Sequence, residues 1–562
     1  MFLPTTREEM REFGWEKLDV IIVTGDTYID SPYIGAAVIG NCLFRAGYRV
    51  GIIAQPDVQG AQDIERLGEP QLFWGITAGS VDSMVANFTA SKKRRWLDDF
   101  TPGGKNTKRP DRASIVYSNL IRRSFKSAKP LVLGGVEASM RRIAHYDYWD
   151  DRVRKSILFD AKADLLVYGM AEKTILELAG KIKNNEDVTK VRGICYISKM
   201  PVNGCINLPS YEEAANDKDK FIKVFKLFYD NNDPLTAKGL CQKHGDRYLI
   251  QNPPSYRPSQ KEIDEIYNMD YTRGVHPYYK KMGPVKAQET IKFSITTHRG
   301  CYGECNFCSI ALHQGGTVLS RSEESILKEA QAIVKLPDFK GYISDVGGGT
   351  ANMFGIECAK KLKYGSCADK RCIFPAICSH MPLNHKRQIE LLRRIRGLRG
   401  IKKVFVASGL RYDMILQDSK FGSAYLREIV KFHISGQLKV APEHSEDNVL
   451  RHMGKPAAGC LKKFISLFEK FNKELGKKQF LTYYFIAAHP GCEMADMAKL
   501  KKFVRRELRI SPEQVQIFTP LPSTYSALMY WTNLDPFTGE RIFVEKDPGK
   551  RERQKTMLAL SS

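Results

Sequence analysis

Three cysteines within eight residues form the one stretch of this chain where residue type and spacing together indicate a chemistry. They are Cys301, Cys305 and Cys308, spaced C-x3-C-x2-C, in a loop that begins at Thr297. Thiolates are the usual protein ligands of iron–sulfur clusters, and such a loop is long enough to bind three corners of a [4Fe–4S] cube. No fourth cysteine follows closely. One iron would therefore keep an open coordination position, which favours substrate chemistry over plain electron transfer.

Two other interpretations of these cysteines are a zinc-binding loop and three unrelated buried thiols. Bacterial ferredoxins use the spacing C-x2-C-x2-C-x3-C, and plant-type ferredoxins have a longer first gap, so neither electron-carrier pattern matches. Zinc usually takes four ligands arranged in C-x2–4-C pairs. The cluster is therefore the preferred interpretation of this loop.

The composition indicates a soluble protein of several domains. A chain of 562 residues, 43% of them hydrophobic, is long enough for about two to four globular domains. The first residues contain no apolar run of signal-peptide length, and no uninterrupted apolar stretch of about 18 residues occurs anywhere. Thirteen cysteines, an odd number, fit a reducing compartment better than a disulfide framework. We therefore expect a cytoplasmic protein with no membrane segment.

The charge balance is strongly basic and would suit an anionic partner. Lys and Arg number 87 against 63 for Asp and Glu, a net charge of +24, which is compatible with RNA binding. Much of the excess lies in helical surface patterns, such as residues 393–396 and 499–509, where charges are usually solvated. We interpret the basic, turn-rich residues 92–112 as a mobile solvated loop.

The first 184 residues alternate between apolar runs and helical patterns. Strands are predicted at residues 20–24, 50–54, 72–76, 131–135 and 165–169. Such an order indicates βαβ units and a mostly parallel sheet with helices on both faces. We therefore predict a doubly wound, Rossmann-like domain at residues 1–184, with any ligand crevice at the C-terminal ends of its strands.

The rest of the chain divides into three parts. Residues 185–285 are predicted to be an irregular connector, because prolines and mixed polarity break both periodicities. In residues 286–545 the alternation resumes, with strands predicted at 291–295, 342–346, 404–407, 438–441, 480–487 and 515–518. Six strand–helix units predict a partial (β/α)6 barrel of the TIM type, with its site at the C-terminal strand ends. The fold class is therefore α/β, and residues 546–562 are predicted to be a charged tail.

The cysteine loop resembles the signature of the radical S-adenosylmethionine (SAM) enzymes, in which Phe307 matches the aromatic residue usual before the last cysteine. This resemblance implies that the amino and carboxylate groups of SAM chelate the open iron. It implies an external one-electron reductant of the flavodoxin or ferredoxin type. The reduced cluster would then split SAM into methionine and a 5′-deoxyadenosyl radical, which abstracts hydrogen from a substrate.

The resemblance also identifies candidate SAM contacts at the C-terminal ends of the predicted barrel strands. The candidates are Gly347, Gly348, Gly349, Ser408, Arg411 and Glu443. The glycines occupy the place of the family's G-G-E segment, where the backbone approaches the SAM amino group, although the acidic third residue is replaced here. The arginine would pair with the SAM carboxylate in a two-pronged fashion. The glutamate would take the ribose hydroxyls.

Over nearly all of its length the chain resembles the YgiQ-type radical SAM proteins, in segments such as residues 2–10 (FLPTTREEM), 408–413 (SGLRYD) and 440–444 (VAPEH). The N-terminal domain is similar to the cobalamin-binding domains that precede several radical SAM cores. Their D-x-H-x-x-G signature is absent, and His145 is the only histidine before His244. Cobalamin therefore stays open as a further cofactor, but an empty scaffold or a substrate-facing domain is the preferred interpretation.

The predicted chemistry leaves several reactions open. We expect an enzyme that cleaves SAM reductively, and the basic charge makes RNA modification one candidate reaction. A small-metabolite radical methylation or rearrangement is an equal competitor. A non-catalytic iron–sulfur or RNA-binding regulator is the alternative from another class, and it would bind RNA with a steep salt dependence and cleave no SAM.

A second group of cysteines lies between the second and third predicted barrel strands. Cys358, Cys367, Cys372 and Cys378 fall within 21 residues. A metal would help to close such a loop, and neighbouring cations would favour thiolates. The spacing lacks C-x2-C pairs, so a second [4Fe–4S] cluster suits it slightly better than zinc. The preferred alternative is that these are free thiols in a loop held by packing.

Overall fold

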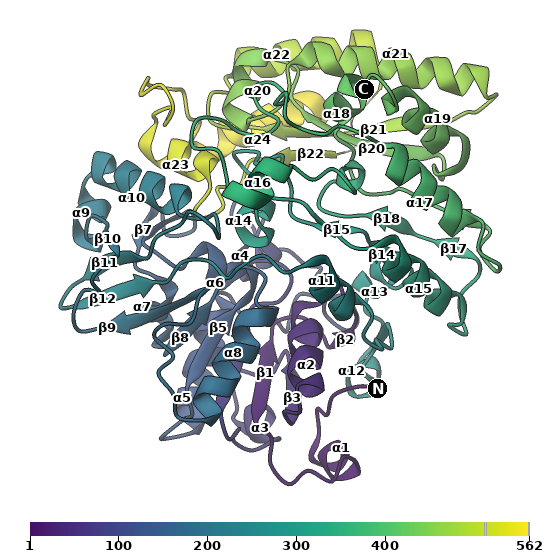
Figure 1. The fold of residues 1–562 in the computed structure, drawn as a ribbon. Helices are drawn as coiled ribbons and strands as arrows, with labels where there is room; N and C mark the ends of the chain where they lie inside the picture. The colour runs from purple at the N-terminus through teal and green to yellow at the C-terminus, as the bar shows by residue number, and fades with distance from the viewer. Residues whose placement is uncertain (511, 513, 560–562) are drawn as a thin grey trace. The chain divides into compact units, whose positions relative to one another are not determined.

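The computed structural model describes residues 1–510, 512 and 514–559, and the chain divides into two compact units (Figure 1). Unit 1 comprises Met1–Lys292 and unit 2 comprises Phe293–Ser562. Each unit has a hydrophobic core of its own. No helix in the described part of the chain is both long and apolar enough to cross a membrane.

Unit 1, all of whose residues are described, is built on a nine-stranded sheet with strand order β10-β11-β12-β9-β8-β5-β4-β1-β3. From β3 to β8 neighbouring strands are parallel, whereas the pairs β8–β9, β9–β12 and β12–β11 are antiparallel. Every residue of β1 and β3 is buried, as expected for parallel strands covered on both faces. The strands are β1 (Val20–Thr24), β3 (Val50–Ala54), β4 (Phe73–Thr77), β5 (Leu131–Gly134), β8 (Leu165–Val167), β9 (Ile194–Ser198), β10 (Ile206–Asn207), β11 (Leu240–His244) and β12 (Arg247–Gln251).

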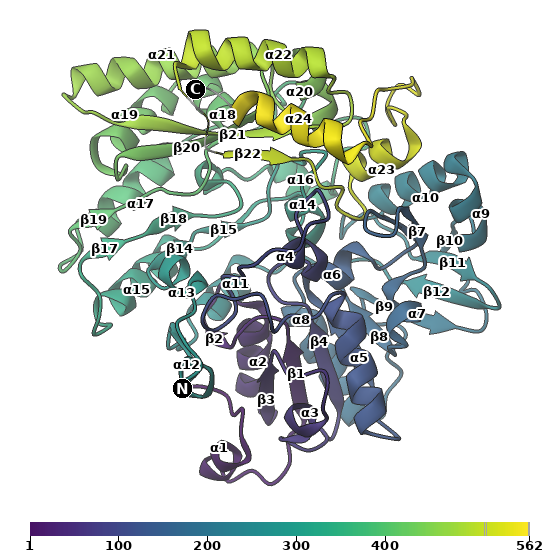
Figure 2. The ribbon, with the colours of Figure 1, turned by 180° about the vertical axis from the view of Figure 1, so that it is seen from behind.

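Helices cover both faces of this sheet, as Figures 1 and 2 show from opposite sides. α2 (Gly35–Arg45) and α8 (Glu172–Lys183) pack together on one face, and α5 (Ala113–Ser124) and α7 (Ile157–Ala161) pack together on the other. This doubly wound arrangement confirms the Rossmann-like fold class predicted for the first part of the chain. The remaining elements of unit 1 are α1 (Arg7–Glu12), β2 (Ile29–Asp30), α3 (Gln62–Glu65), α4 (Ser83–Asn87), α6 (Gly135–Met140), β6 (His145–Asp147), β7 (Arg152–Arg154), α9 (Tyr211–Asn216), α10 (Lys218–Asp230), α11 (Gln260–Tyr267), β13 (Gly274–Val275), α12 (Pro277–Lys280) and α13 (Ala287–Ile291).

Residues 185–285 extend the sheet, so the prediction of an irregular connector was wrong. β9 pairs with both β8 and β12, and β11 and β12 form a hairpin that turns at Gly245 and Asp246. These strands mix polar and apolar residues and take partners from distant segments, so their local sequence carries little strand signal. The structure divides at Lys292 instead of at residue 184.

Unit 2 contains a partial barrel of parallel strands in sequence order. β14 pairs with β18, β17 with β19, β20 with β21 and β21 with β22, all in parallel. β17 and β18 are two parts of one strand interrupted at Ser344, and an isolated parallel bridge joins Leu410 to Val440 of β20. The arrangement confirms the predicted partial (β/α)6 barrel. The strands are β14 (Ser294–Thr296), β17 (Tyr342–Ile343), β18 (Asp345–Gly347), β19 (Lys403–Val404), β20 (Gln437–Glu443), β21 (Phe480–Ala487) and β22 (Gln514–Ile517).

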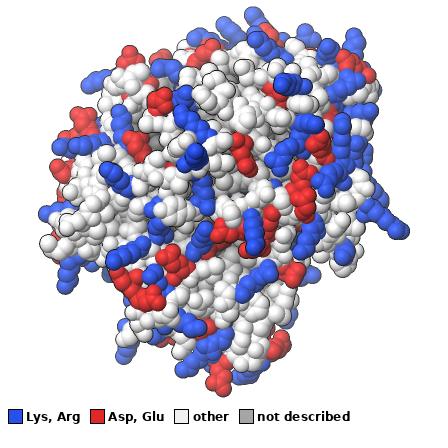
Figure 3. All heavy atoms as spheres, viewed as in Figure 1, with Lys and Arg blue, Asp and Glu red and all other residues white. Residues whose placement is uncertain are grey.

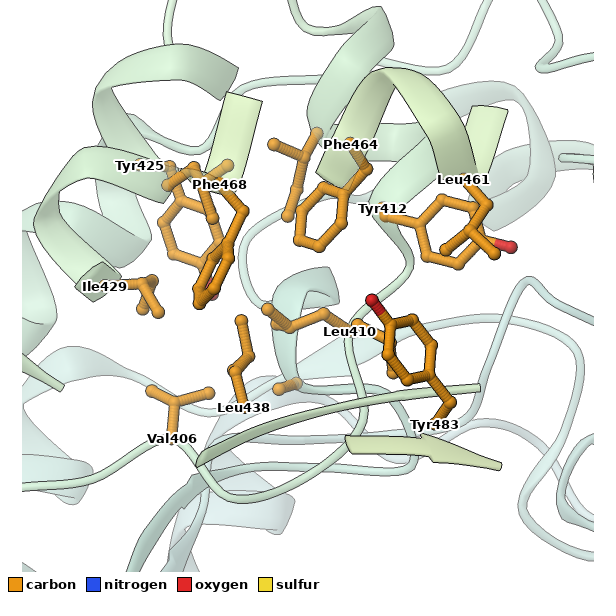
Figure 4. Packing of buried hydrophobic residues seen from close by; sticks show 14 of the residues in the cluster. Val406, Leu410, Tyr412, Tyr425, Ile429, Leu438, Leu461, Phe464, Phe468 and Tyr483 are labelled. Atoms are coloured by element: carbon orange, nitrogen blue, oxygen red, sulfur yellow. The ribbon is translucent and has the colours of Figure 1, made fainter. Parts of the chain in front are cut away.

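The helices between these strands bury their apolar faces in one core, part of which Figure 4 shows. Phe464 and Phe468 of α21 (Ala458–Glu474), with Tyr425 of α19 (Gly422–Phe432), face Leu438 of β20. The remaining elements of unit 2 are β15 (His298–Arg299), α14 (Ile310–Gln314), β16 (Leu319–Ser320), α15 (Glu323–Val334), η1 (Ala351–Met353), α16 (Ala359–Tyr364), α17 (Lys386–Arg396), α18 (Tyr412–Gln417), α20 (Asp447–Met453), α22 (Met494–Phe503), η2 (Val504–Leu508), α23 (Tyr525–Thr532) and α24 (Pro548–Ala559).

Two predictions near the ends of unit 2 were wrong. Residues 546–562 were predicted to be a charged tail, but α24 packs against α22 and β22 and buries Arg551 and Gln554. Residues 560–562 of that prediction lie outside the described residues. The first barrel strand was predicted from Ile291, where α13 ends, and β14 begins only at Ser294. The polarity of the local sequence gives the wrong prediction in both places, because contacts with distant segments decide which side chains become buried.

The segment predicted to be a mobile solvated loop is anchored at the C-terminal ends of β1 and β4. The side chain of Arg109 is fully buried, with Nη2 2.8 Å from Asp26 Oδ1 and Nε 3.1 Å from Asp98 Oδ2. Nη1 of Arg109 donates to Ala78 O at 2.5 Å. Polar, turn-rich sequence looks the same whether its polar groups bond to water or to one another, which is why the prediction failed.

We expect Arg109→Met to lower the free energy of unfolding of unit 1 by about 3–5 kcal/mol, because it leaves two buried carboxylates without their cation. Chemical denaturation followed by tryptophan fluorescence measures this change, since Trp74 is buried in unit 1. The control is Arg94→Met, which removes a pair with Asp111 whose side chains are 50% and 42% exposed. The control should cost at most about 1 kcal/mol. Equal losses in the two variants would contradict this interpretation of the buried pairs.

Candidate functional site

The cysteine loop follows β14 and β15 at the C-terminal edge of the barrel. β14 pairs with β18 so that Thr296 lies opposite Gly347, and Thr297 N donates to Gly347 O at 2.7 Å. Because parallel strands end at the same edge of a sheet, the cysteine loop and the glycine triplet leave the barrel side by side. The structure thus brings these two predicted groups together at the edge where barrel enzymes carry their sites.

The thiols of Cys301 and Cys305 converge with a guanidinium beside Gly303. A Cβ atom added to Gly303 would lie 3.2 Å from Cys301 Sγ, 3.6 Å from Cys305 Sγ and 3.3 Å from Arg411 Nη1. Cys301 Sγ also accepts a hydrogen bond from Gly303 N at 3.3 Å and lies 3.4 Å from Thr350 Oγ1. A side chain at position 303 would therefore press against both a thiol and the guanidinium, and glycine lets these groups approach one another.

Cys308 supplies the third thiol of the loop. Burial, followed by the neighbouring Cys305, Cys301 and Glu443, raises the pKa of Cys308 to about 12. Burial also raises the pKa of Cys301. Without a metal these thiols are held as neutral S–H groups, so metal binding must displace their protons.

The glycine triplet is packed closely by the chain itself. A Cβ atom on Gly348 would lie 2.6 Å from His298 Cε1, and one on Gly347 would lie 3.1 Å from Ser408 Oγ. Ser408 is committed to Asp345, whose carboxylate accepts from Ser408 N at 3.1 Å and from its hydroxyl. The glycines therefore allow close packing, and Ser408 ties β18 to the segment that follows β19.

Arg411 is buried beside the cysteine loop. Its Nη1 lies 3.9 Å from Cys305 Sγ, whereas Nε and Nη2 donate to Asp413 at 2.8 and 2.6 Å. The two-pronged face that the family resemblance assigned to the SAM carboxylate is thus occupied by Asp413. Only Nη1 of this guanidinium is directed at the cysteines.

A buried series of hydrogen bonds, here called the Asn352 relay, holds the backbone of Arg411. Asn352 Oδ1 accepts from Arg411 N at 2.8 Å, and Asn352 Nδ2 donates to Arg411 O at 3.0 Å. The same Nδ2 lies 3.2 Å from His385 Nε2, and His385 Nδ1 lies 2.7 Å from Asp418 Oδ2. These partners place the imidazole proton on Nδ1, so that Nε2 accepts from the amide. Isolated polar residues such as these carry no sequence signal, and sequence reasoning missed them.

Glu443 ends β20 in a strained conformation. Its φ is 68°, in the left-handed region, where a residue other than glycine costs about 1–3 kcal/mol. Burial raises the pKa of Glu443, and Lys455 Nζ lies 3.7 Å from its Oε1. The carboxyl group is close enough to Cys308 to raise the pKa of that thiol. Strain of this kind is concentrated at functional sites, which keeps Glu443 a candidate for the site.

The cysteine-rich insert braces the cysteine loop through two cations, of which sequence reasoning noted only Arg371, as a neighbour of the insert's thiols. Lys361 is buried, with Nζ 3.2 Å from Glu304 Oε1 and 2.6 Å from Gly316 O. Arg371 Nη1 donates to Asn306 Oδ1 at 2.7 Å. Glu304 and Asn306 are themselves members of the loop, so the insert fixes its conformation from outside.

The four cysteines of the insert do not form a compact metal site. Cys372 Sγ lies 3.6 Å from Lys361 Nζ, while Cys378 Sγ lies 4.0 Å from His380 Nδ1. Across the described residues, no three His, Cys, Asp or Glu side chains converge to hold a single metal ion. A single-ion criterion does not apply to a [4Fe–4S] cube, because the thiolates of a cube bind separate irons and stand farther apart than the about 3.8 Å between two thiolates on one zinc.

Curated relatives match the chain over nearly its whole length, and residues 2–294 match the Radical SAM N-terminal family. A UPF0313 protein of Fusobacterium nucleatum is 59% identical over 99% of this chain and 98% of its own length. A UPF0313 protein of Thermotoga maritima is 49% identical over 99% of this chain and 98% of its own. One from Clostridium perfringens is 46% identical over 99% of this chain and 84% of its own.

Solved structures of radical SAM enzymes share the fold. TsrM, a radical SAM methyltransferase from Kitasatospora setae with cobalamin and a [4Fe–4S] cluster bound, has a TM-score of 0.52 at 15% identity, over 91% of this chain and 74% of its own. OxsB, a cobalamin-dependent SAM radical enzyme with aqua-cobalamin bound, has a TM-score of 0.51 at 11% identity, over 93% of this chain and 56% of its own. Likeness at these identities establishes the fold alone. With the family match and the UPF0313 relatives, the chain belongs to the UPF0313 family of radical SAM enzymes, which confirms the resemblance to the YgiQ-type proteins.

Proposed function

We propose that this enzyme binds one [4Fe–4S] cluster through Cys301, Cys305 and Cys308, and one SAM beside it at the C-terminal edge of the barrel. The observation that carries the proposal is the convergence of two thiols and the Arg411 guanidinium at Gly303. When bound, the cluster and SAM supply a one-electron reductive cleavage that yields methionine and a 5′-deoxyadenosyl radical.

The chain's own residues suit the binding and orientation of these groups. Arg411 Nη1 lies 3.9 Å from Cys305 Sγ, where its positive charge would offset part of the negative charge of a bound cluster. Gly347, Gly348 and Gly349 leave the barrel beside the cysteine loop, where their backbone would approach the SAM amino group.

Two further side chains complete the proposed SAM site. Glu443 would accept hydrogen bonds from the ribose hydroxyls, and Lys455 holds its carboxylate. Ser408 acts by positioning, since its hydroxyl donates to Asp345. The electron would come from an external one-electron donor of the flavodoxin or ferredoxin type, as the family membership implies.

The ligand role of the three cysteines is tested by anaerobic reconstitution with iron and sulfide, followed by dithionite and SAM. We expect about four irons per chain and formation of 5′-deoxyadenosine. Cys301→Ala, Cys305→Ala and Cys308→Ala should each reduce 5′-deoxyadenosine to background, because each removes one of only three thiolate ligands. The control, Cys460→Ala, changes a half-buried cysteine of α21 and should retain wild-type yield. A wild-type yield of 5′-deoxyadenosine from the triple Cys→Ala variant would contradict the assignment. About eight irons per wild-type chain would support a second cluster in the insert.

The Asn352 relay generates a second expectation for the same assay. Asn352→Leu should lower the rate of 5′-deoxyadenosine formation about 10–100-fold at unchanged iron content, because Arg411 loses both hydrogen bonds that the Asn352 amide makes to its backbone. His385→Gln should give a smaller loss in the same direction. The control, His433→Gln, changes a buried histidine that lies 2.8 Å from Val404 O and outside the relay. If the rate of 5′-deoxyadenosine formation fell in proportion to the melting temperature (Tm) in all three variants, the Asn352 relay would contribute only to stability.

One surface of unit 1 favours RNA over a small metabolite as the substrate. Trp96 is 89% exposed and Leu97 is 66% exposed, directly after the exposed basic residues 92–95. Backbone bridges from Phe88 to Arg94 and from Leu97 to Lys105 fix this segment. An exposed aromatic ring that follows basic residues is an arrangement on which single-stranded bases stack. On the face seen in Figure 3, Lys and Arg are interspersed with Asp and Glu, so the argument rests on Trp96 and its neighbours and not on the net charge.

RNA binding is measured by fluorescence anisotropy of a labelled uridine-rich oligonucleotide at two salt concentrations. Wild-type affinity should fall as salt rises, because released counterions drive phosphate binding. Trp96→Ala should weaken binding about tenfold through lost base stacking. Phe480→Ala, which removes a ring that is 67% exposed in unit 2, is the control and should have no effect. If Trp96→Ala binds like wild type, the small-metabolite reaction becomes the better candidate.

A further inference from the structure

The strand order of unit 1 reverses between β1 and β4, which places its ligand crevice over their C-terminal ends. The chain leaves β1 toward β3 on one side and leaves β4 toward β5 on the other. In open α/β sheets, ligands bind in the crevice at such a reversal. A corrin with its nucleotide tail would therefore be expected above Gly25 and Asp26 after β1, and Ala78 and Gly79 after β4.

Side chains of unit 1 already occupy this crevice. Arg109 lies in it with no exposed surface, bonded to Asp26 and Asp98 and to the carbonyl oxygen of Ala78. A Cβ atom added to Gly25 would lie 2.2 Å from Ala78 O, and one on Gly79 would lie 2.2 Å from Asp26 Oδ1. The two strand ends are thus in contact through the chain's own atoms, with the guanidinium between them.

The backbone donors that a phosphate or amide would need are also taken. Gly25 N donates to Thr77 O at 3.1 Å, and Thr27 N donates to Phe100 O at 3.0 Å. Ser80 N donates to Asp26 Oδ2 at 2.6 Å. Ligands at strand ends are usually held by free N–H groups of this kind.

A second layer of contacts closes the crevice on the side of β3. Gln55 Nε2 donates to Gly25 O at 2.9 Å and to Thr101 Oγ1 at 2.7 Å. The hydroxyl of Thr27 donates to Phe100 O at 2.6 Å. Residues 98–109 therefore bond to all three strand ends at the reversal, which are those of β3, β1 and β4.

The one histidine in the first part of the chain is not available as a cobalt ligand at this position. His145 is buried in β6, with Nδ1 3.0 Å from Ile143 O. The adjacent Ala144 N donates to Gln242 Oε1 of β11, a strand separated from β4 by β12, β9, β8 and β5.

We infer that residues 98–109 close the crevice of unit 1 with the chain's own groups, so that this Rossmann-like unit does not bind cobalamin there. The residues present do not fit the cobalamin that is bound in the structures of TsrM and OxsB. The consequence for the reaction rests on the proposed function: the substrate radical would arise at the barrel site alone, with no corrin to carry a methyl group.

Cobalt retention tests this inference on the full chain. The anaerobically reconstituted protein is incubated with excess hydroxocobalamin or methylcobalamin, desalted, and analysed for cobalt and iron, with serum albumin as the control. We expect about four irons per chain and no more cobalt than albumin retains. About one cobalt per chain would overturn the inference.

The same samples, assayed for 5′-deoxyadenosine, separate this inference from the proposed function. Product without cobalt supports both. If neither 5′-deoxyadenosine nor retained cobalt is detected, the closed crevice is supported and the proposed function is contradicted. Product that forms only with added cobalamin overturns the closed crevice and leaves the proposed function standing.

Arginine labelling tests the closure directly. Phenylglyoxal modification, mapped by mass spectrometry, should be at least about tenfold slower at Arg109 than at Arg152, because the reagent reaches a buried group only through local opening. The side chain of Arg109 is 0% exposed and that of Arg152 is 68% exposed. Added hydroxocobalamin should change neither rate. Equal rates at the two arginines, or a cobalamin-dependent rate at Arg109, would show an open crevice.

Discussion

The side-chain amide of Asn352 is the contact on which the geometry of the candidate site most depends. Its oxygen and nitrogen bond both backbone groups of Arg411, and the nitrogen also reaches His385. Moving any member of this set would leave a buried polar group unpaired, at a cost of about 1–3 kcal/mol. The segment after the glycine triplet and the arginine beside the cysteines are therefore held as one rigid body.

The two units use buried charge in opposite ways. At the strand ends of unit 1, Arg109 is matched by Asp26 and Asp98, and the neighbouring backbone donors already have acceptors inside the chain. At the barrel edge of unit 2, Glu443 is buried at a positive φ with Lys455 3.7 Å away, and the thiols face Arg411 Nη1. Matched groups stabilise a closed surface, whereas incompletely matched groups leave binding capacity for a ligand.

The same fold can therefore carry different cofactors. A Rossmann-like sheet supplies a crevice only where the strand order reverses, and whether a ligand enters depends on the loops above it. In this chain one loop, residues 98–109, provides the arginine, the aspartate and the carbonyl oxygen that fill the space. Similarity of fold alone would have assigned the crevice to cobalamin.

The sequence by itself determined the features that depend on neighbouring residues. The C-x3-C-x2-C spacing defined the candidate cluster ligands, because all three thiols belong to one loop. Continuous apolar runs located β1 and β3, since strands buried on both faces leave no polar alternation to misread. The order of strands and helices along the chain then predicted both α/β folds, the Rossmann-like unit and the partial barrel.

Only the tertiary structure decided the contacts between residues far apart in the chain. His385 meets Asn352 across 33 residues, and Arg109 meets Asp26 across 83. The antiparallel strands β9, β11 and β12 were missed for the same reason, because their partners and not their own residues make them strands. Burial of a polar side chain is favourable only when it finds a hydrogen-bond or ion-pair partner, and a partner from a distant part of the chain leaves no signal in the local sequence.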